Sequence, residues 1–142
     1  MRQISFPGQI ESLTPIATFL EELSEEAGLE MKASYGMQLA VDELVTNIIT
    51  HAYEECGRSG EVLFEVELTE SELTLVIEDS GDFYDPTQKP PPDDLDKPLE
   101  ERQIGGLGIY LALRSVDQFR YERKGDRNRN IIMMRRPGAS IA

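Results

Sequence analysis

The stretch Glu43-Leu44-Val45-Thr46-Asn47 decides how this sequence of 142 residues is interpreted. It lies inside an amphipathic region that we predict to be one helix from about Lys32 to Glu54. Glu43, Asn47 and His51 recur every four residues, so they share one face of that helix. A solvated polar face would explain the spacing. The alternative is a site in which Asn47 offers an amide oxygen to a hard cation such as Mg²⁺ and Glu43 accepts a proton.

A second polar group follows the apolar strand that we predict over Leu73–Glu78. It reads Glu78-Asp79-Ser80-Gly81, at the point where the apolar pattern stops. An Asp at a strand end often only caps a turn. A partly enclosed carboxylate can also accept a hydrogen bond from an exocyclic amine such as that of adenine, and Gly81 would let the backbone approach the ring.

The third group is Gly105-Gly106-Leu107-Gly108, which opens a predicted helix from Ile109 to about Val116. Glycines at a helix start expose backbone N–H groups that suit phosphates. The group lacks the Lys of a P-loop and does not directly follow a strand, so it is weak evidence by itself. It is preceded by Asp82–Gln103, which holds five prolines and is predicted to be a loop of the lid or binding kind.

The remaining pattern predicts two further kinds of element. A helix is expected over Ser12–Ala27, with Ser12 as its N-cap and Gly28 as its stop. The predicted strands are Met1–Phe6 at an edge, Glu61–Thr69, Leu73–Glu78, Gln118–Lys124 and Asn130–Arg136. We therefore expect an α+β fold in a single domain over residues 1–142. It is a two-layer α/β sandwich whose mixed, mostly antiparallel sheet is covered on one face by three helices.

Composition and charge exclude several classes of protein. The single Cys56 rules out an intrachain disulfide framework, and the single His51 argues against a zinc centre. No apolar stretch reaches membrane-spanning length and no signal peptide is visible, so we expect a cytoplasmic chain without a membrane partner. Residues 1–113 carry a net charge of −18 and residues 114–142 carry +5. Direct nucleic-acid binding is therefore the weaker interpretation.

The order and spacing of the three motifs resemble the N, G1 and G2 boxes of the ATPase fold shared by gyrase, Hsp90, histidine kinases and MutL. The most specific resemblance is to the anti-sigma-factor serine/threonine kinases of the RsbW and SpoIIAB type, and it spans roughly residues 5–136. Two details carry it: the N box continues as His51-Ala52-Tyr53-Glu54, and the G1 box ends in Tyr84-Asp85-Pro86. The sequence also shows no dimerisation helix pair with an acceptor His, as a histidine kinase would need.

The resemblance implies ATP and Mg²⁺ as cofactors and phosphoryl transfer to serine or threonine as the reaction. Asn47 would bind Mg²⁺, Asp79 the adenine amine, and Glu43 would be the base that receives the hydroxyl proton. The other implied nucleotide contacts are Gly81, Gly105, Gly106 and Gly108. The loop over residues 82–103 would be the ATP lid, and His51 would pack or cap rather than catalyse.

The same resemblance implies protein partners. The kinase would phosphorylate a small antagonist with a STAS domain and otherwise bind a sigma factor or a comparable output protein. It would work as a homodimer, and the sheet edge at Met1–Phe6 is a candidate for the contact between subunits. The acidic excess of the first 113 residues favours a basic surface on the partner.

Three departures from the family pattern leave a second function open. Phe83 replaces the second glycine of the G1 box, and Arg129-Asn130 stands where the family usually has Gly-Thr, so Asn130 would have to substitute for the threonine. Ile104 occupies a place where some relatives have Arg, which leaves Arg102 as the nearest group for the γ-phosphate. The alternative is a catalytically weak or inactive nucleotide-binding module that regulates a partner by sequestration. A detached histidine-kinase ATPase is a third, less favoured possibility.

Overall fold

The computed structural model describes residues 2–88 and 106–137. In chain order the elements are β1 (Arg2–Pro7), η1 (Ile10–Ser12), α1 (Leu13–Ala27), α2 (Met31–Asn47), η2 (Ile48–Glu54), β2 (Glu61–Leu68), β3 (Glu72–Asp79), η3 (Pro86–Gln88), α3 (Gly106–Leu113), β4 (Gln118–Lys124) and β5 (Arg127–Arg135). The strands form one sheet in the order β1-β2-β3-β5-β4, in which β1 and β4 are the edges.

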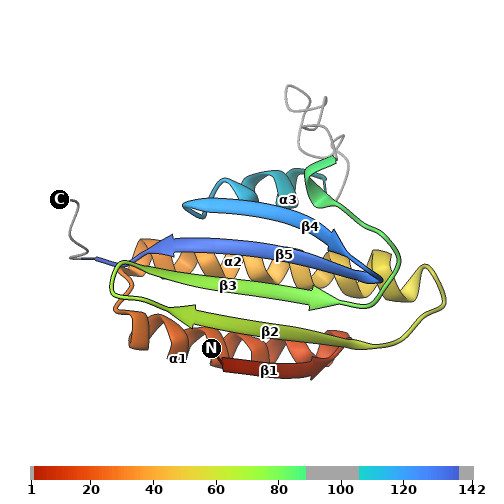
Figure 1. Cartoon of the computed structure of the whole chain (residues 1–142), viewed down its shortest axis with the longest axis horizontal. Coiled ribbons are helices and arrows are strands. Elements are labelled where there is room, and N and C mark those ends of the chain that lie inside the picture. The colour runs from red at the N-terminus through yellow and green to blue at the C-terminus, as the bar shows by residue number, and fades with distance from the viewer. Residues whose placement is uncertain (1, 89–105, 138–142) are drawn as a thin grey trace.

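The sheet and the helices form two layers, as Figure 1 shows. Each neighbouring pair of described strands is antiparallel. The helices α1, α2 and α3 lie behind the sheet in this view, and α2 packs against both α1 and α3. The predicted α+β two-layer fold is confirmed, and β1 lies at the predicted edge.

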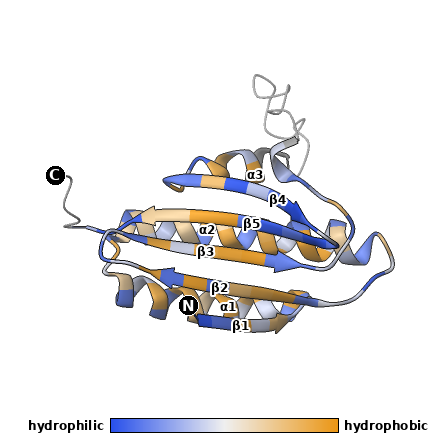
Figure 2. Ribbon diagram, viewed as in Figure 1, coloured by the Kyte–Doolittle hydropathy of each residue, from blue (hydrophilic) through white to orange (hydrophobic). Residues whose placement is uncertain are grey.

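Alternation along the strands explains which face the helices cover. In β2 the buried residues Val62, Phe64 and Val66 alternate with the more exposed Glu61 and Glu65. Figure 2 shows apolar stretches on the central strands β3 and β5, with polar residues at the end of β3 and the start of β5. The apolar side chains meet the buried stripes of α1 and α2 in one core. Among the described helices, none is both long and apolar enough to cross a membrane.

The first helix ends as predicted but begins differently. Gly28 has a φ of 70°, and its N–H closes the last turn of α1 onto Ser24 and Glu25. The predicted N-cap role of Ser12 is wrong, because Ser12 is itself helical and makes no side-chain cap. Its hydroxyl instead donates to the carbonyl of Pro7 at 2.6 Å, which ties the helix start to the end of β1.

The second predicted helix, Lys32–Glu54, is present but changes its winding. Residues 31–47 are α-helical and residues 48–54 form a π-helical turn, in which the N–H of Glu55 reaches the carbonyl of Thr50. The turn carries Tyr53, whose buried hydroxyl donates to the carbonyl of Glu61 at 2.6 Å and accepts from the N–H of Ser80 at 3.1 Å. The helix that holds Asn47 is therefore fastened to β2 and to the end of β3.

Two boundaries near the carboxyl end differ from the prediction. Helix α3 spans Gly106–Leu113 instead of Ile109 to Val116, so Gly106 and Gly108 lie in its first turn. Strand β5 starts at Arg127, three residues before the predicted Asn130, whereas β4 has the predicted bounds. The early start of β5 brings Asn128 into the sheet, directly opposite Asp79.

Candidate functional site

The predicted site residues Asn47, Asp79 and Asn130 come from α2, β3 and β5. Asn47 is the last residue of α2 and Asp79 is the last residue of β3. Strand β5 places Asn128 opposite Asp79 and Asn130 opposite Ile77, so both amides are on the face that the helices cover. The bond between Ser80 and Tyr53 holds the end of β3 against the turn that follows Asn47.

Asp79 is a buried carboxylate with only one of its oxygens paired. The side chain is 1% exposed. Its Oδ1 accepts hydrogen bonds at 2.9 Å from both the N–H of Gly81 and the amide of Asn128. Its buried Oδ2 has no hydrogen-bond partner among the described residues. Burial raises the pKa of this carboxyl above its ordinary value, although the two donors at Oδ1 oppose the rise. Such an oxygen is suited to a donor from a ligand.

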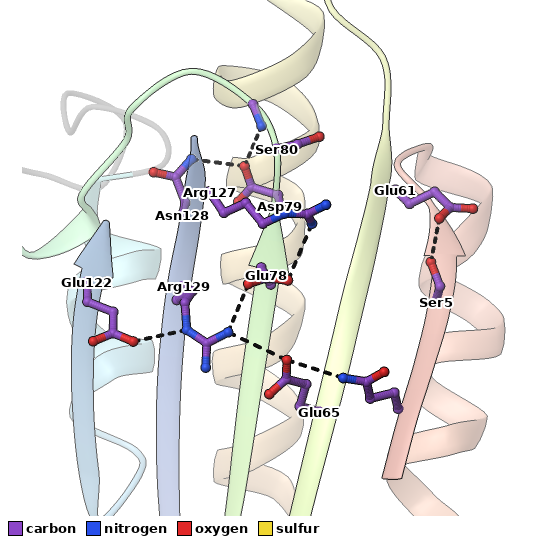
Figure 3. Close-up of polar contacts among 12 residues, drawn as sticks. Ser5, Glu61, Glu65, Glu78, Asp79, Ser80, Glu122, Arg127, Asn128 and Arg129 are labelled. Carbon is purple, nitrogen blue, oxygen red and sulfur yellow. Dashed lines mark hydrogen bonds and ion pairs between the residues drawn. The ribbon is translucent and has the colours of Figure 1, made fainter. Parts of the chain in front are cut away.

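Asn128 is the residue that orients Asp79, and the sequence prediction did not find it. Its Nδ2 donates to Asp79 at 2.9 Å and to the carbonyl of Asp82 at 2.8 Å. Its Oδ1 accepts from the N–H of Tyr84 at 3.2 Å and from Arg123 at 3.1 Å. One buried amide thus joins the carboxylate to the loop after β3. Figure 3 shows its contact with Asp79.

The structure adds Asn128 to the prediction that Asn130 substitutes near Asp79. Asn128 makes the contact with Asp79, and Asn130 lies two residues further along β5, opposite Ile77. Asn130 is nevertheless buried, and its Oδ1 has no hydrogen-bond partner in the described part of the chain. Asp79 and Asn130 therefore present two unpaired acceptor oxygens on the same face of the sheet.

The helix contributes Asn47 and Glu43 one turn apart. The Nδ2 of Asn47 is buried and makes no hydrogen bond to the described residues. Glu43 is half-buried, and its pKa is raised first by burial and then by the neighbouring Asp42. The described residues hold no group of three or more His, Cys, Asp or Glu side chains that would bind a metal ion. A Mg²⁺ ion at Asn47 would therefore take further oxygen ligands from a nucleotide.

His51 lies on the same helical face, but its ring packs against the loop after β3. Its ring stacks on that of Tyr84, with 5.1 Å between the centroids and 11° between the planes, and its Nδ1 contacts Glu55. The backbone of Tyr84 is in turn held by Asn128. His51 thus supports the loop after β3, in line with the expectation that it packs rather than catalyses.

The loop after β3 lies close to the turn η2. A Cβ atom on Gly81 would stand 2.5 Å from the carbonyl oxygen of Ala52, so only glycine fits there. This close neighbour is the helix backbone, a different constraint from the predicted approach to a base. Phe83, which replaces a G1 glycine, is largely exposed and touches the ring of Tyr121 edge-on. The substitution therefore places a side chain outside the buried site.

The phosphate end of the site is described only in part. Gly106 and Gly108 lie in the first turn of α3, where free backbone N–H groups suit an anion. Gly105, Arg102 and Ile104 lie outside the described residues. Of the predicted lid over 82–103, the structure describes residues 82–88, which end in the turn η3, and the rest lies outside.

Arg129 does not enter the site, although it stands where the family usually has glycine. Its side chain lies on the opposite face of the sheet, between the carboxylates of Glu78 at 2.8 Å, Glu122 at 3.0 Å and Glu65 at 3.5 Å. Figure 3 shows this chain of ion pairs across the strands. Arg127 and Arg129 of β5 thus have acidic partners on their own sheet.

The family follows from the sequence as a whole. Residues 6–136 match the family described as the histidine kinase-like ATPase domain, and the chain belongs to it. Serine-protein kinase RsbW of Staphylococcus aureus strain JH9 is 29% identical over 119 residues, which cover 82% of this chain and 75% of that protein. Its counterpart in strain Newman matches to the same extent. The predicted resemblance to the RsbW kinases is confirmed.

Solved structures agree with the fold. The crystal structure of the RsbU and RsbW domains of Rv1364c from Mycobacterium tuberculosis matches all of this chain with a TM-score of 0.63 and 14% identity, and this chain spans 35% of that one. The histidine kinase AdeS of Acinetobacter baumannii matches 97% of this chain and 70% of its own, with a TM-score of 0.51 and 15% identity. At these identities the likeness shows the fold alone.

Proposed function

We propose that this chain is an ATP- and Mg²⁺-dependent serine/threonine protein kinase of an anti-sigma regulatory system. The observation that carries the proposal is a set of buried polar atoms on Asn47, Asp79 and Asn130, from α2, β3 and β5, that have no hydrogen-bond partner within residues 2–88 and 106–137. A polar atom that is buried without a hydrogen-bond partner costs about 1–3 kcal/mol of folding free energy. A bound ligand that pairs with these atoms is the simplest reason for their presence. The similarity to kinases named RsbW supports the reaction.

Each residue has a defined task in this proposal. The Oδ2 of Asp79 accepts a hydrogen bond from the adenine amine, and Asn130 lies on the same face for the neighbouring edge of the base. Asn47 turns its amide oxygen to Mg²⁺, since an amide can present either end. The backbone of Gly106 and Gly108, with Gly81 near the base and Gly105 and Arg102 beyond the described residues, completes the set of nucleotide contacts.

Glu43 is the proposed base. Bound ATP would supply the γ-phosphoryl group: the substrate hydroxyl would give its proton to the Glu43 carboxylate and bond to the γ-phosphorus, while the bond to the β,γ-bridging oxygen breaks and ADP leaves. A carboxylate whose pKa is raised by burial and by Asp42 is a stronger base than an exposed one. The proposed substrate is a STAS-domain antagonist, and the proposed second partner is a sigma factor or a comparable output protein. We further propose that the chain works as a homodimer in the cytoplasm.

A nucleotide titration tests the site. Asn47→Ala should weaken ATP binding only when Mg²⁺ is present, whereas Asp79→Ala should weaken it with and without the metal and should relax the preference for adenine. Calorimetry measures both affinities, and Asp82→Ala, at an exposed residue of the nearby loop, is the control. Equal ATP affinity in the wild type and in Asp79→Ala would mean that the pocket is misplaced.

The alternative is a module that binds nucleotide but does not transfer phosphate. The exposed Phe83 and the replacement of Gly-Thr by Arg129-Asn130 favour it, because both depart from the family pattern. The titration does not separate the two functions. Transfer of labelled phosphate to a STAS-domain protein does, since the module would bind ATP and leave the antagonist unlabelled.

A further inference from the structure

The helical layer carries a groove that is distinct from the nucleotide site. It encloses about 240 Å³ between α1 and α2. The floor is formed by the buried residues Ile16, Leu20 and Val41, and the walls include Ala17 and Tyr35. Tyr35 is 70% exposed, which is unusual for a large ring beside an apolar floor. The floor is therefore apolar and open, and a wall of the groove is an aromatic side chain with little packing of its own.

The rim of this groove is acidic. Asp42 borders the apolar part, and Glu21 and Glu25 border a second hollow that shares Tyr35 with the first. In the described part of the chain, none of these three acids takes part in an ion pair. Helix α1 contains no Lys or Arg, and α2 contains only Lys32. The acids are thus left to act together on a cationic partner.

From this combination we propose that the groove between α1 and α2 is a docking site for a basic amphipathic helix of a partner protein. A mostly apolar groove between two helices suits a helix with apolar side chains at i, i+3, i+4 and i+7. The acidic rim then pairs with Lys or Arg on the flanks of that helix. This groove is then the surface through which a regulatory partner binds the proposed kinase. Only the identity of that partner rests on the proposed function.

A second copy of this chain does not meet the requirement. Its described helices α1, α2 and α3 together contain one Lys and no Arg. The basic residues of the described chain lie mostly on β4, β5 and the turns beside them, which are extended and cannot present a helical stripe. The charge pattern therefore favours a different protein over self-association.

Docking here would also act on the proposed base. Asp42 borders the groove and is the neighbour of Glu43 in α2. Its charge contributes to the raised pKa of Glu43, after burial. A Lys or Arg of the partner beside Asp42 would offset that contribution. Occupancy of the groove is in this way linked to the proton acceptor one helical turn before Asn47.

The test uses the full chain and a labelled peptide that places Leu along one helical face and Lys on the other. Fluorescence anisotropy measures its binding. A scrambled peptide of equal charge, without an apolar face, and a Leu/Glu peptide are the peptide controls. We expect the Leu/Lys helix to bind at least about tenfold more tightly than the scrambled peptide, because only the helix fills the floor.

Two neighbouring residues of α1 provide matched variants. Ala17→Lys places a long cationic side chain in the groove, whereas Thr18→Lys adds the same charge at an exposed residue beside it. Ala17→Lys should weaken peptide binding by at least about tenfold, and Thr18→Lys by less than about threefold, because an exposed charge is screened. Tyr35→Ala, at an exposed wall, should also weaken it. ATP affinity, measured in parallel, should be unchanged in all three variants.

Adsorption by net charge alone, or docking of a second copy, would overturn the inference. Equal binding of the scrambled peptide, or equal loss in Ala17→Lys and Thr18→Lys, would mean adsorption by net charge alone. A shift of the chain from dimer to monomer in Ala17→Lys and Tyr35→Ala, without loss of peptide binding, would mean that a second copy is the occupant. Normal peptide binding by a chain that does not bind ATP would refute the proposed kinase and leave the docking site standing.

Discussion

The two carboxylate oxygens of Asp79 have different surroundings. Its Oδ1 is held by Gly81 and Asn128, which gives the carboxylate a fixed direction. Its buried Oδ2 lacks a partner among the described residues. Because burial raises the pKa, the fold disfavours the ionised form. An ionised Asp79 is therefore less favourable in the free protein than an exposed carboxylate, and a ligand donor at Oδ2 would stabilise it.

This situation predicts that Asp79→Asn stabilises the free protein while it removes the adenine contact. A carboxyl whose folded pKa is raised leaves stability unaffected below the ordinary Asp pKa and lowers stability as the pH rises through the raised value. At pH 7 the variant should be more stable by roughly 1–2 kcal/mol, and the difference should vanish at about pH 3. Urea unfolding at both pH values measures it.

A nearby carboxylate of opposite character serves as the control for this change. Asp82 is exposed and pairs with Arg58, and its pKa is lowered, with a Cys56 hydrogen bond as the first cause. Asp82→Asn should therefore not stabilise the protein at pH 7. A gain in Asp82→Asn as large as in Asp79→Asn would show that the gain comes from reduced net charge and not from the buried site.

At the scale of elements, the register of β5 decides which amide supports the site. Asn128 spans from Asp79 to the loop after β3, so Asn128→Ala would leave several buried groups unpaired. We expect a loss of roughly 2–3 kcal/mol in stability together with weaker ATP binding. Asn130→Ala removes an amide whose Oδ1 is already unpaired, so it should weaken ATP binding with less than about 1 kcal/mol of destabilisation.

Chemical denaturation and nucleotide titration of the two variants separate these effects. Equal losses of stability would mean that β5 does not hold Asp79 as described. A larger loss in Asn130→Ala would favour the register in which Asn130, the residue chosen from the sequence, contacts Asp79.

The same strand shows where sequence reasoning succeeds and where it stops. The apolar residues Val62, Phe64 and Val66 at every second position are enough to predict β2, since one face must be buried. At the start of β5, Asn128 faces the helices and Arg127 and Arg129 lie on the other face. These residues show no alternation of apolar and polar side chains, so the sequence pattern does not predict that the strand begins here. The role of Asn128 depends on a pairing 49 residues away in sequence, which local patterns do not contain.

The helix that bears the site was similarly predicted in part. The apolar spacing finds α2, and the resemblance places Glu43, Asn47 and Asp79 on elements that the structure brings together. The π-helical turn over Ile48–Glu54 was missed, because its residues continue the helical pattern and its hydrogen bonds depend on packing. That turn positions Tyr53 and His51 against the loop that follows Asp79.

For the whole molecule, charge is distributed unevenly between the two ends of the chain. The helices α1 and α2 carry most of the unpaired acids described above, whereas much of the positive charge of β5 is taken up by carboxylates on the outer face of the sheet. Residues 1–113 carry −18 in sum. A field of this size would attract a basic partner.

The field predicts association rates that fall as salt rises. Binding of a basic sigma factor or similar partner should slow by about tenfold or more between low and high salt, because the screening length drops to roughly 3 Å at 1 M. Stopped-flow mixing measures the rate. Rates that do not change with salt would contradict electrostatic steering.

Light scattering of the free chain tests the proposed homodimer. A monomer at high concentration would contradict it.

The central claim is that this site transfers a phosphoryl group, and transfer of labelled phosphate from ATP to a STAS-domain antagonist tests it most directly. The wild type should label a serine or threonine of the antagonist only in the presence of Mg²⁺. Glu43→Ala should bind ATP normally and lose transfer by roughly 10²–10⁴-fold, the usual effect of removing a general base. Transfer by Glu43→Ala at the wild-type rate, or no transfer by a wild type that binds ATP, would contradict the account.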